Sequence, residues 1–269
     1  MPAPVAPGSR SVGDMLDAAF SRFKSGALKC LPMMLPAVLA GQMAEYYWLL
    51  SGHRGVSPFQ ARDGTYLALY VAGFVMYLLF ASAATLQLAS VHAGKPLGGI
   101  EQLRRALGRW PAMVATFVLA AVVTAACLLP VAFVYQLSVL LRLSPAVATA
   151  GSMLLLAPAV YVMVAFSVLL PVVLLEQSVT FRALRRSFDL VRPRWVRVFA
   201  ALLIAGLAAV ICLVAAWAAL QMLLGAVGPG NAPLANAIMA TALLLAFSLV
   251  QLFMLSLALE IYSSASASA

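Results

Sequence analysis

Hydrophobic residues gather into six long stretches, which short polar segments separate. The stretches run from about Ser25 to Leu50, Thr65 to Val91, Trp110 to Leu140, Pro145 to Glu176, Val196 to Leu224 and Pro233 to Tyr262. Each is longer than the roughly 20 apolar residues with which a helix crosses the hydrocarbon core of a bilayer. Backbone amides find no water in that core, so each stretch should be helical, and none shows the alternation of a barrel strand. The pattern predicts an all-α membrane protein with six transmembrane helices.

Composition supports the same fold class. Of the 269 residues, 64% are hydrophobic and 9% are charged, whereas soluble domains have about 45–50% apolar and about 25% charged residues. A soluble globular fold is therefore excluded. The three cysteines, Cys30, Cys127 and Cys212, lie in or beside apolar stretches without a CxxC spacing. They predict neither a disulfide framework nor a metal site.

Lysine and arginine are distributed unequally between the two sides of the predicted membrane. The N-terminal segment and the connections after the second and fourth stretches hold 14 of them, and the opposite side holds three, Arg54, Arg62 and Arg142. The positive-inside rule then predicts that both termini are cytoplasmic. The net charge of +9 follows from this topology and does not indicate nucleic-acid binding. The expected partners are membrane lipids, mainly anionic headgroups on the cytoplasmic side, and a membrane-protein partner is left open.

The three basic segments share a short pattern. Each has a leucine, a small residue three positions later and a large apolar residue four positions later, in the segments 16–20, 103–107 and 184–188. These offsets place the three residues on one face of a helix. The pattern predicts three repeats, about 11–91, 98–140 with 145–176, and 178–262. In each, a short cytoplasmic amphipathic helix precedes a transmembrane hairpin. The alternative is three unrelated cytoplasmic helices that share only amphipathicity.

The domain boundaries follow from this division. We expect a disordered N-terminus over 1–10, a single six-helix transmembrane domain over 11–262 and a flexible tail over 263–269. In the third short helix, Arg185 and Arg186 should face the headgroups, and Leu184 and Phe188 should reach the acyl boundary.

Few side chains in the apolar stretches carry a polar group of functional interest. Glu176 ends the fourth stretch, and we expect it to pair with one of the arginines that follow. Glu260 ends the sixth stretch, and we expect a partner from the third cytoplasmic helix. Interhelical hydrogen bonding is the ordinary use of the remaining candidates. The alternative is a polar substrate path, and the residues concerned are Glu45, Gln87, Gln136 and Gln221.

Catalytic signatures are missing from the sequence. His53 and His92, the only histidines, flank the second stretch on opposite sides, and no Ser/His/Asp set, HExxH, P-loop or dinucleotide-binding glycine loop is present. We expect no catalytic, cofactor-binding or metal-binding residues. The leading hypothesis is a non-enzymatic structural or accessory protein that organises lipid or supports a partner. The alternatives are a small transporter or channel and, less favoured, an intramembrane enzyme that modifies lipids.

Two segments resemble a known group of proteins. They are Arg10-Ser-Val-Gly-Asp-Met-Leu-Asp-Ala-Ala-Phe20, and Pro171-Val-Val-Leu-Leu-Glu176 with Ala183-Leu-Arg-Arg-Ser-Phe-Asp-Leu-Val191. They resemble bacterial six-span proteins of the glycerophosphoryl diester phosphodiesterase membrane-domain type and the related YciC-like families. The resemblance implies an integral inner-membrane protein. In some relatives this region is fused to a phosphodiesterase barrel, but the resemblance supplies no catalytic residues here.

Overall fold

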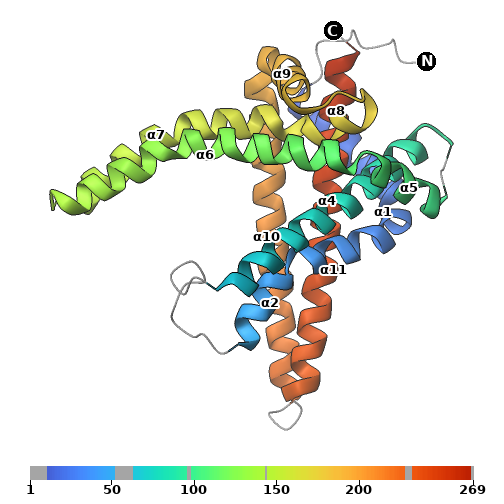
Figure 1. Cartoon of the computed structure of the whole chain (residues 1–269). Coiled ribbons are helices and arrows are strands. Elements are labelled where there is room, and N and C mark those ends of the chain that lie inside the picture. Colours follow the sequence, from blue (N-terminus) through green and yellow to red (C-terminus); the bar gives the residue numbers. More distant parts are fainter. Residues whose placement is uncertain (1–10, 52–62, 96–97, 143, 228–231, 268–269) are drawn as a thin grey trace. The chain divides into compact units, whose positions relative to one another are not determined.

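The computed structural model describes all residues except 1–10, 52–62, 96–97, 143, 228–231 and 268–269. The predicted disordered N-terminus, 1–10, lies outside this part of the chain. The described residues form helices and no strands (Figure 1). Six helical segments are long and apolar enough to cross a membrane: Val12–Gly41, Gly64–His92, Trp110–Ser138, Thr149–Leu175, Thr180–Met222 and Ile238–Ser266. The fourth and the fifth each contain a 3₁₀ turn. The predicted fold class is confirmed, and the chain is a multi-pass membrane protein.

The helices follow the predicted stretches closely. In chain order they are α1 (Val12–Gly41), α2 (Met43–Leu50), α4 (Gly64–His92), α5 (Gly99–Gly108), α6 (Trp110–Leu140), α7 (Pro145–Ala165), the 3₁₀ turn η1 (Phe166–Val168), α8 (Leu169–Leu175), α9 (Thr180–Val191), the 3₁₀ turn η2 (Arg192–Arg194), α10 (Trp195–Val227) and α11 (Ala232–Ser266).

The first short helix is not a separate element. Helix α1 runs without interruption from Val12 into the first apolar stretch, because residues 14–31 contain no proline and a single glycine, Gly26, and therefore nothing that ends a helix. By contrast, α5 ends at Gly108 and α9 ends at η2, so these two short helices are distinct.

The fourth predicted stretch is interrupted. Helix α7 ends at Ala165, and η1 and α8 complete the stretch. Pro171 lies in α8 and has no backbone N–H, and its ring clashes with the carbonyl four residues earlier, that of Ser167 in η1. Beyond α8, Gln177 and Thr180 have φ values of 59° and 48°. These left-handed residues reverse the chain into α9.

The helices group into two compact units. The single domain that the sequence predicts over 11–262 stays a prediction. The first unit contains Pro111–Leu202 and the described residues of Met1–Val12 and Ile261–Ala269, and the second unit contains Gly13–Trp110 and Leu203–Glu260. Two of the boundaries fall well inside α10 and near the end of α11, and the other two lie at the starts of α1 and α6. A hydrophobic pattern locates such helices but does not show where their packing partners change.

In the second unit, α1, α4 and α11 surround a shared core. Its fully buried side chains include Met34 of α1, Leu88 of α4 and Leu252 of α11. Helices α1 and α4 approach closely at two glycines. A Cβ atom at Gly26 would lie 2.6 Å from Leu88 Cδ2, and one at Gly73 would overlap the carbonyl oxygen of Ala40. Glycine is required at Gly73, where the obstructing atom belongs to the backbone and any side chain would push the helices apart. At Gly26 the Leu88 side chain would have to shift to admit a larger residue.

In the first unit, α8 is the most buried segment. All its residues from Leu169 to Leu174 are buried. Helix α9 packs on α7, η1 and α8. Leu184 of α9 is buried within the protein, and the Phe188 ring contacts that of Tyr161. This corrects the expectation that these two side chains reach lipid, because α8 offers α9 an apolar protein surface.

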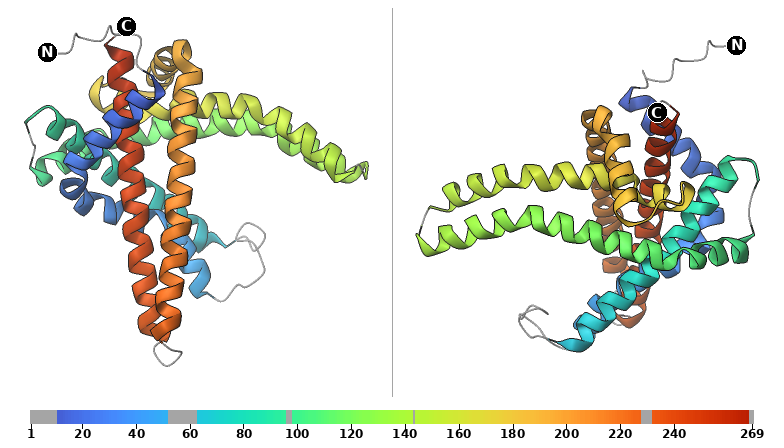
Figure 2. Two further views of the ribbon diagram at one scale, coloured as in Figure 1. Left: turned by 180° about the vertical axis from the view of Figure 1, so that it is seen from behind. Right: turned by 45° about the horizontal axis from the view of Figure 1, so that its top comes forward.

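Helices α6 and α7 run side by side in every view (Figures 1 and 2). Many of their large apolar side chains are exposed, among them Leu129, Phe133, Met153 and Leu154. Exposing such a large apolar surface to water is unfavourable, whereas the hydrocarbon of a bilayer can cover it.

Helix α11 continues to Ser266, four residues past the predicted end at Tyr262. This corrects the start of the predicted flexible tail. The side chains of Ser264 and Ser266 return hydrogen bonds to the carbonyls of Ile261 and Ser263, and Arg194 donates to the carbonyl of Ser264 at 2.8 Å. The Arg194 bond satisfies a carbonyl that the helix end would otherwise leave open.

Candidate functional site

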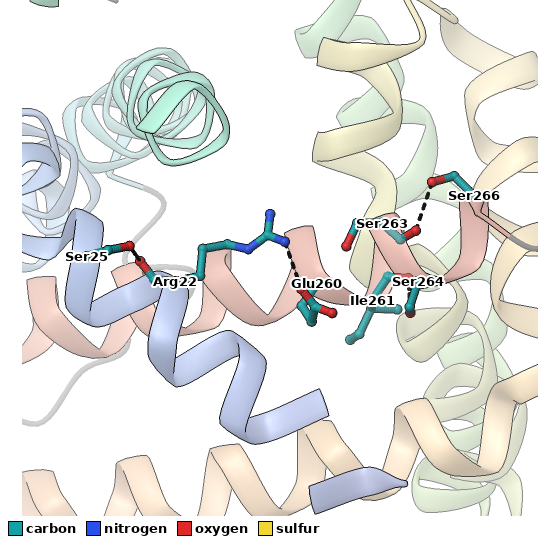
Figure 3. Close-up of polar contacts among 7 residues, drawn as sticks. All are labelled: Arg22, Ser25, Glu260, Ile261, Ser263, Ser264 and Ser266. Atoms are coloured by element: carbon teal, nitrogen blue, oxygen red, sulfur yellow. Dashed lines mark hydrogen bonds and ion pairs between the residues drawn. The ribbon is translucent and has the colours of Figure 1, made fainter. Parts of the chain in front are cut away.

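A buried ion pair joins α1 to α11 in the second unit. Arg22 Nη2 donates to Glu260 Oε2 at 2.7 Å, and the two side chains are 6% and 4% exposed. Figure 3 shows Arg22 extending from α1 toward Glu260, while Ser25 bonds back to the Arg22 carbonyl. We had expected a partner for Glu260 from the third cytoplasmic helix, whereas the structure pairs it with the first helix.

The sequence does contain a signal for this pair. Arg22 lies on the same face of α1 as Met15, Ala19 and Gly26, which are all buried. Spacings of three and four residues bring these positions together on a helix. An arginine on such an apolar face needs an acid from another segment, because an unpaired charge is costly to bury. The pattern does not reveal which acid that is.

A second cluster, in the first unit, is centred on Glu176. The residue follows α8, and the reversal of the chain brings Arg186 of α9 back toward it. Arg186 Nε donates to the two carboxylate oxygens at 3.2 and 3.0 Å. The expected pairing of Glu176 with a following arginine is therefore present. Tyr262 of α11, which the sequence did not suggest, also donates to Glu176 Oε1, at 3.3 Å.

The outer face of α9 is rich in arginine. The exposed face of α9 carries Arg182, Arg185 and Asp189. Arg192, which follows the helix, is also exposed. Arg185 Nε lies 4.0 Å from Asp189 Oδ2, and these side chains are 80% and 56% exposed. The opposite face carries Ala183, Leu184, Ser187, Leu190 and Val191, all buried. Ser187 Oγ donates to the carbonyl of Ala165 at 2.6 Å, and this hydrogen bond fixes α9 to the end of α7.

Helix α5, in the second unit, has a weaker basic face. Arg105 Nε donates to Glu101 Oε1 at 2.8 Å, one helical turn away, so its charge is partly neutralised. Arg104 is exposed. The buried face of α5 consists of Gln102 and Ala106.

Glu45 takes part in a hydrogen bond between helices. It accepts from the hydroxyl of Tyr66 at 2.7 Å, which links α2 to α4. The Tyr66 ring also meets Trp48 edge to face, with centroids 5.6 Å apart. Nearby, Tyr47 donates to Asp63 at 3.1 Å. These contacts explain Glu45 as a residue that holds the end of the helix pair in place.

The three candidate glutamines are not brought together at one described site. Gln136 and Gln221 are exposed on α6 and α10, and Gln87 of α4 is half-buried. The side-chain amide oxygen of Gln87, Oε1, is buried and accepts no hydrogen bond from the residues that the structure describes. A shallow hollow of about 370 Å³ on α11 is lined by Ile238, Thr241, Ala242 and Leu245, so no glutamine contributes to it.

Within the described part of the chain, no three His, Cys, Asp or Glu side chains lie close enough together to hold a metal ion. Cys30, Cys127 and Cys212 are free thiols.

Comparison of the chain with protein-family models, with curated proteins and with solved structures gave no match.

Proposed function

We propose that this chain is a non-enzymatic structural or accessory protein of a bacterial inner membrane, with both termini cytoplasmic, and that it organises lipid or supports a membrane partner. The observation that carries the proposal is how the charges near the ends of the long apolar helices are used. Arg22 and Glu260 neutralise each other, as do Glu176 and Arg186. The electrostatic attraction within each pair therefore holds helices together. A transporter or an enzyme would direct such groups into a cavity.

The positions of the glutamines disfavour a polar path through the membrane. At 1.5 Å per residue, Gln136 lies about 39 Å along α6 from Trp110, and Gln221 lies about 39 Å along α10 from Trp195. Both distances exceed the roughly 30 Å of the hydrocarbon core. Gln87 lies about 8 Å from the end of α4 at His92. All three therefore belong near headgroups, whereas a substrate site would need polar groups near the middle of the bilayer.

The internal repeat is part of the proposal, because the same position is buried in each copy. Ala19, Ala106 and Ser187 are the small residues of the three patterns, and each is 0% exposed. A small side chain lets a helix approach its neighbour closely. We also propose membership of the six-span family that residues 10–20 and 171–191 resemble.

Thiol accessibility in native membranes tests the proposal. In a background with Cys30, Cys127 and Cys212 replaced by alanine, a cysteine is introduced at buried Ala81, in the middle of α4. A packed interior predicts that a membrane-impermeant, water-soluble maleimide does not label Ala81→Cys from either side. Labelling of Ala81→Cys would show a water-filled path and favour a transporter instead.

Two exposed positions serve as controls and test the topology. Ser51 and Ala93 lie just beyond the opposite ends of the α2–α4 pair. Ser51→Cys should be labelled in intact cells, and Ala93→Cys should be labelled only after the membrane is opened. The reverse order would contradict cytoplasmic termini.

A further inference from the structure

We propose that the arginine face of α9 is a docking surface for the phosphate headgroups of anionic phospholipids in the cytoplasmic leaflet. The inference rests on the proposed function, because it requires α9 to lie at the inner surface of the membrane. It goes beyond general attraction between a basic protein and an anionic membrane, since it assigns the selectivity to one short helix.

The first argument is the charge that α9 leaves available. Glu176 accounts for Arg186, and Asp189 is the only acid in α9. Its contact with Arg185 is long, at 4.0 Å, and both side chains are exposed, so the pair is held weakly. Within the described residues, no acidic side chain pairs with Arg182 or Arg192. At least two full positive charges therefore face outward, and a third is only loosely compensated.

The second argument is the rigidity of the surface. The buried face of α9 packs on α7, η1 and α8, and the Ser187 hydrogen bond fixes its depth on Ala165. The arginine side chains thus project from a backbone that cannot rotate to hide them. Guanidinium groups offer paired N–H donors that match two oxygens of one phosphate. A fixed row of them can select phosphate-bearing headgroups with a net negative charge.

The third argument is the presence of exposed apolar groups beside the charges. Phe181, next to Arg182, is 70% exposed, and Val196, which follows η2, is 71% exposed. A purely aqueous anion would gain nothing from these side chains. A phospholipid meets both kinds of group, because its phosphate lies next to the start of its acyl chains. The mixture of arginine with an aromatic and an aliphatic side chain favours a lipid as the occupant.

Native mass spectrometry of the full chain in detergent, with equal phosphatidylglycerol and phosphatidylcholine, tests the assignment. The natural sequence should retain phosphatidylglycerol preferentially. Each surface arginine contributes about fivefold to anionic lipid binding, so the triple variant R182Q/R185Q/R192Q should lower the preference at least tenfold. The matched control is R104Q/R105Q/R109Q, which removes the same formal charge around α5. Because Glu101 already pairs with Arg105 there, this variant should lower the preference by a clearly smaller factor than the α9 variant.

A second variant shows whether a loss of binding in the triple variant could come from unfolding. Asp189→Asn removes the only acid of α9 and should raise the preference for phosphatidylglycerol several-fold, a gain that unfolding cannot produce. The inference is overturned if the α9 triple variant keeps its preference, if the α5 variant loses as much, or if D189N has no effect. It is also overturned if the natural chain shows no preference. That result would leave an unlabelled Ala81→Cys, and hence the proposed function, intact.

Discussion

Arg22 and Glu260, 238 positions apart in the sequence, form an ion pair of 2.7 Å with both side chains buried. Removing one partner leaves an uncompensated buried charge, which costs about 3–5 kcal/mol. We therefore expect Arg22→Met to lower the free energy of unfolding by that amount, as measured by denaturation of the purified chain in mixed micelles. The double variant R22M/E260L removes both charges, and it should recover most of the loss. If the double variant loses as much unfolding free energy as R22M and E260L lose together as single variants, the two residues are not coupled.

The close approach of α1 and α4 makes a prediction about glycine. Gly73→Ala places a methyl group against the Ala40 carbonyl, so the helices must separate, and we expect a loss of about 1–3 kcal/mol. The matched control is Gly206→Ala in α10, where a Cβ atom would meet nothing within 4 Å. There, alanine should be neutral or stabilise the helix by up to about 1 kcal/mol. Thermal unfolding followed by circular dichroism compares the two, and equal effects would contradict the packing.

If the internal repeat is real, replacing the small residue of each copy by leucine should have a similar effect on stability. Ala19→Leu, Ala106→Leu and Ser187→Leu each force a larger side chain into a filled position, and each should cost about 1–3 kcal/mol. Leu107→Ala, next to Ala106 but 57% exposed, is the control and should change stability by less than about 0.5 kcal/mol. Expression and thermal stability of the set provide the measurement. A tolerated leucine at one of the three positions would remove that copy from the repeat.

The cluster at Glu176 should matter less than the Arg22–Glu260 pair. The Arg186 and Glu176 side chains are 40% and 24% exposed, and ion pairs accessible to solvent contribute up to about 1 kcal/mol. Glu176→Gln should therefore destabilise the chain by about 1 kcal/mol or less, and Tyr262→Phe by about 0.5–1.5 kcal/mol. Added salt should shrink the effect of E176Q but not that of E260Q. An E176Q effect as large as that of E260Q, or independent of salt, would reveal a different role for this residue.

Local pattern explains most of what the sequence could predict. The six helices follow from runs of apolar residues, and the pairing of Glu176 with Arg186 follows from a separation of only ten residues. The break at η1 also has a local cause, Pro171, although the sequence shows many prolines that leave helices intact, such as Pro130 in α6.

Long-range packing explains what the sequence could not show. Whether Leu184 meets lipid or protein depends on where α8 lies, and apolar residues suit both surroundings equally. Likewise, the face of α1 shows that Arg22 needs a partner, but several acids are available in the chain. Only the assembled helices decide that the partner is Glu260 and that Tyr262 joins Glu176.

The long separation of Arg22 and Glu260 also has a consequence for biogenesis. A ribosome adds roughly 5–20 residues per second, so on the order of 10–50 s pass between synthesis of the arginine and of the glutamate. During that interval the guanidinium must remain at the aqueous edge of the membrane. Helix α1 can form this ion pair only after α11 has been synthesised, so the contact between the two helices is made after the intervening helices have entered the membrane.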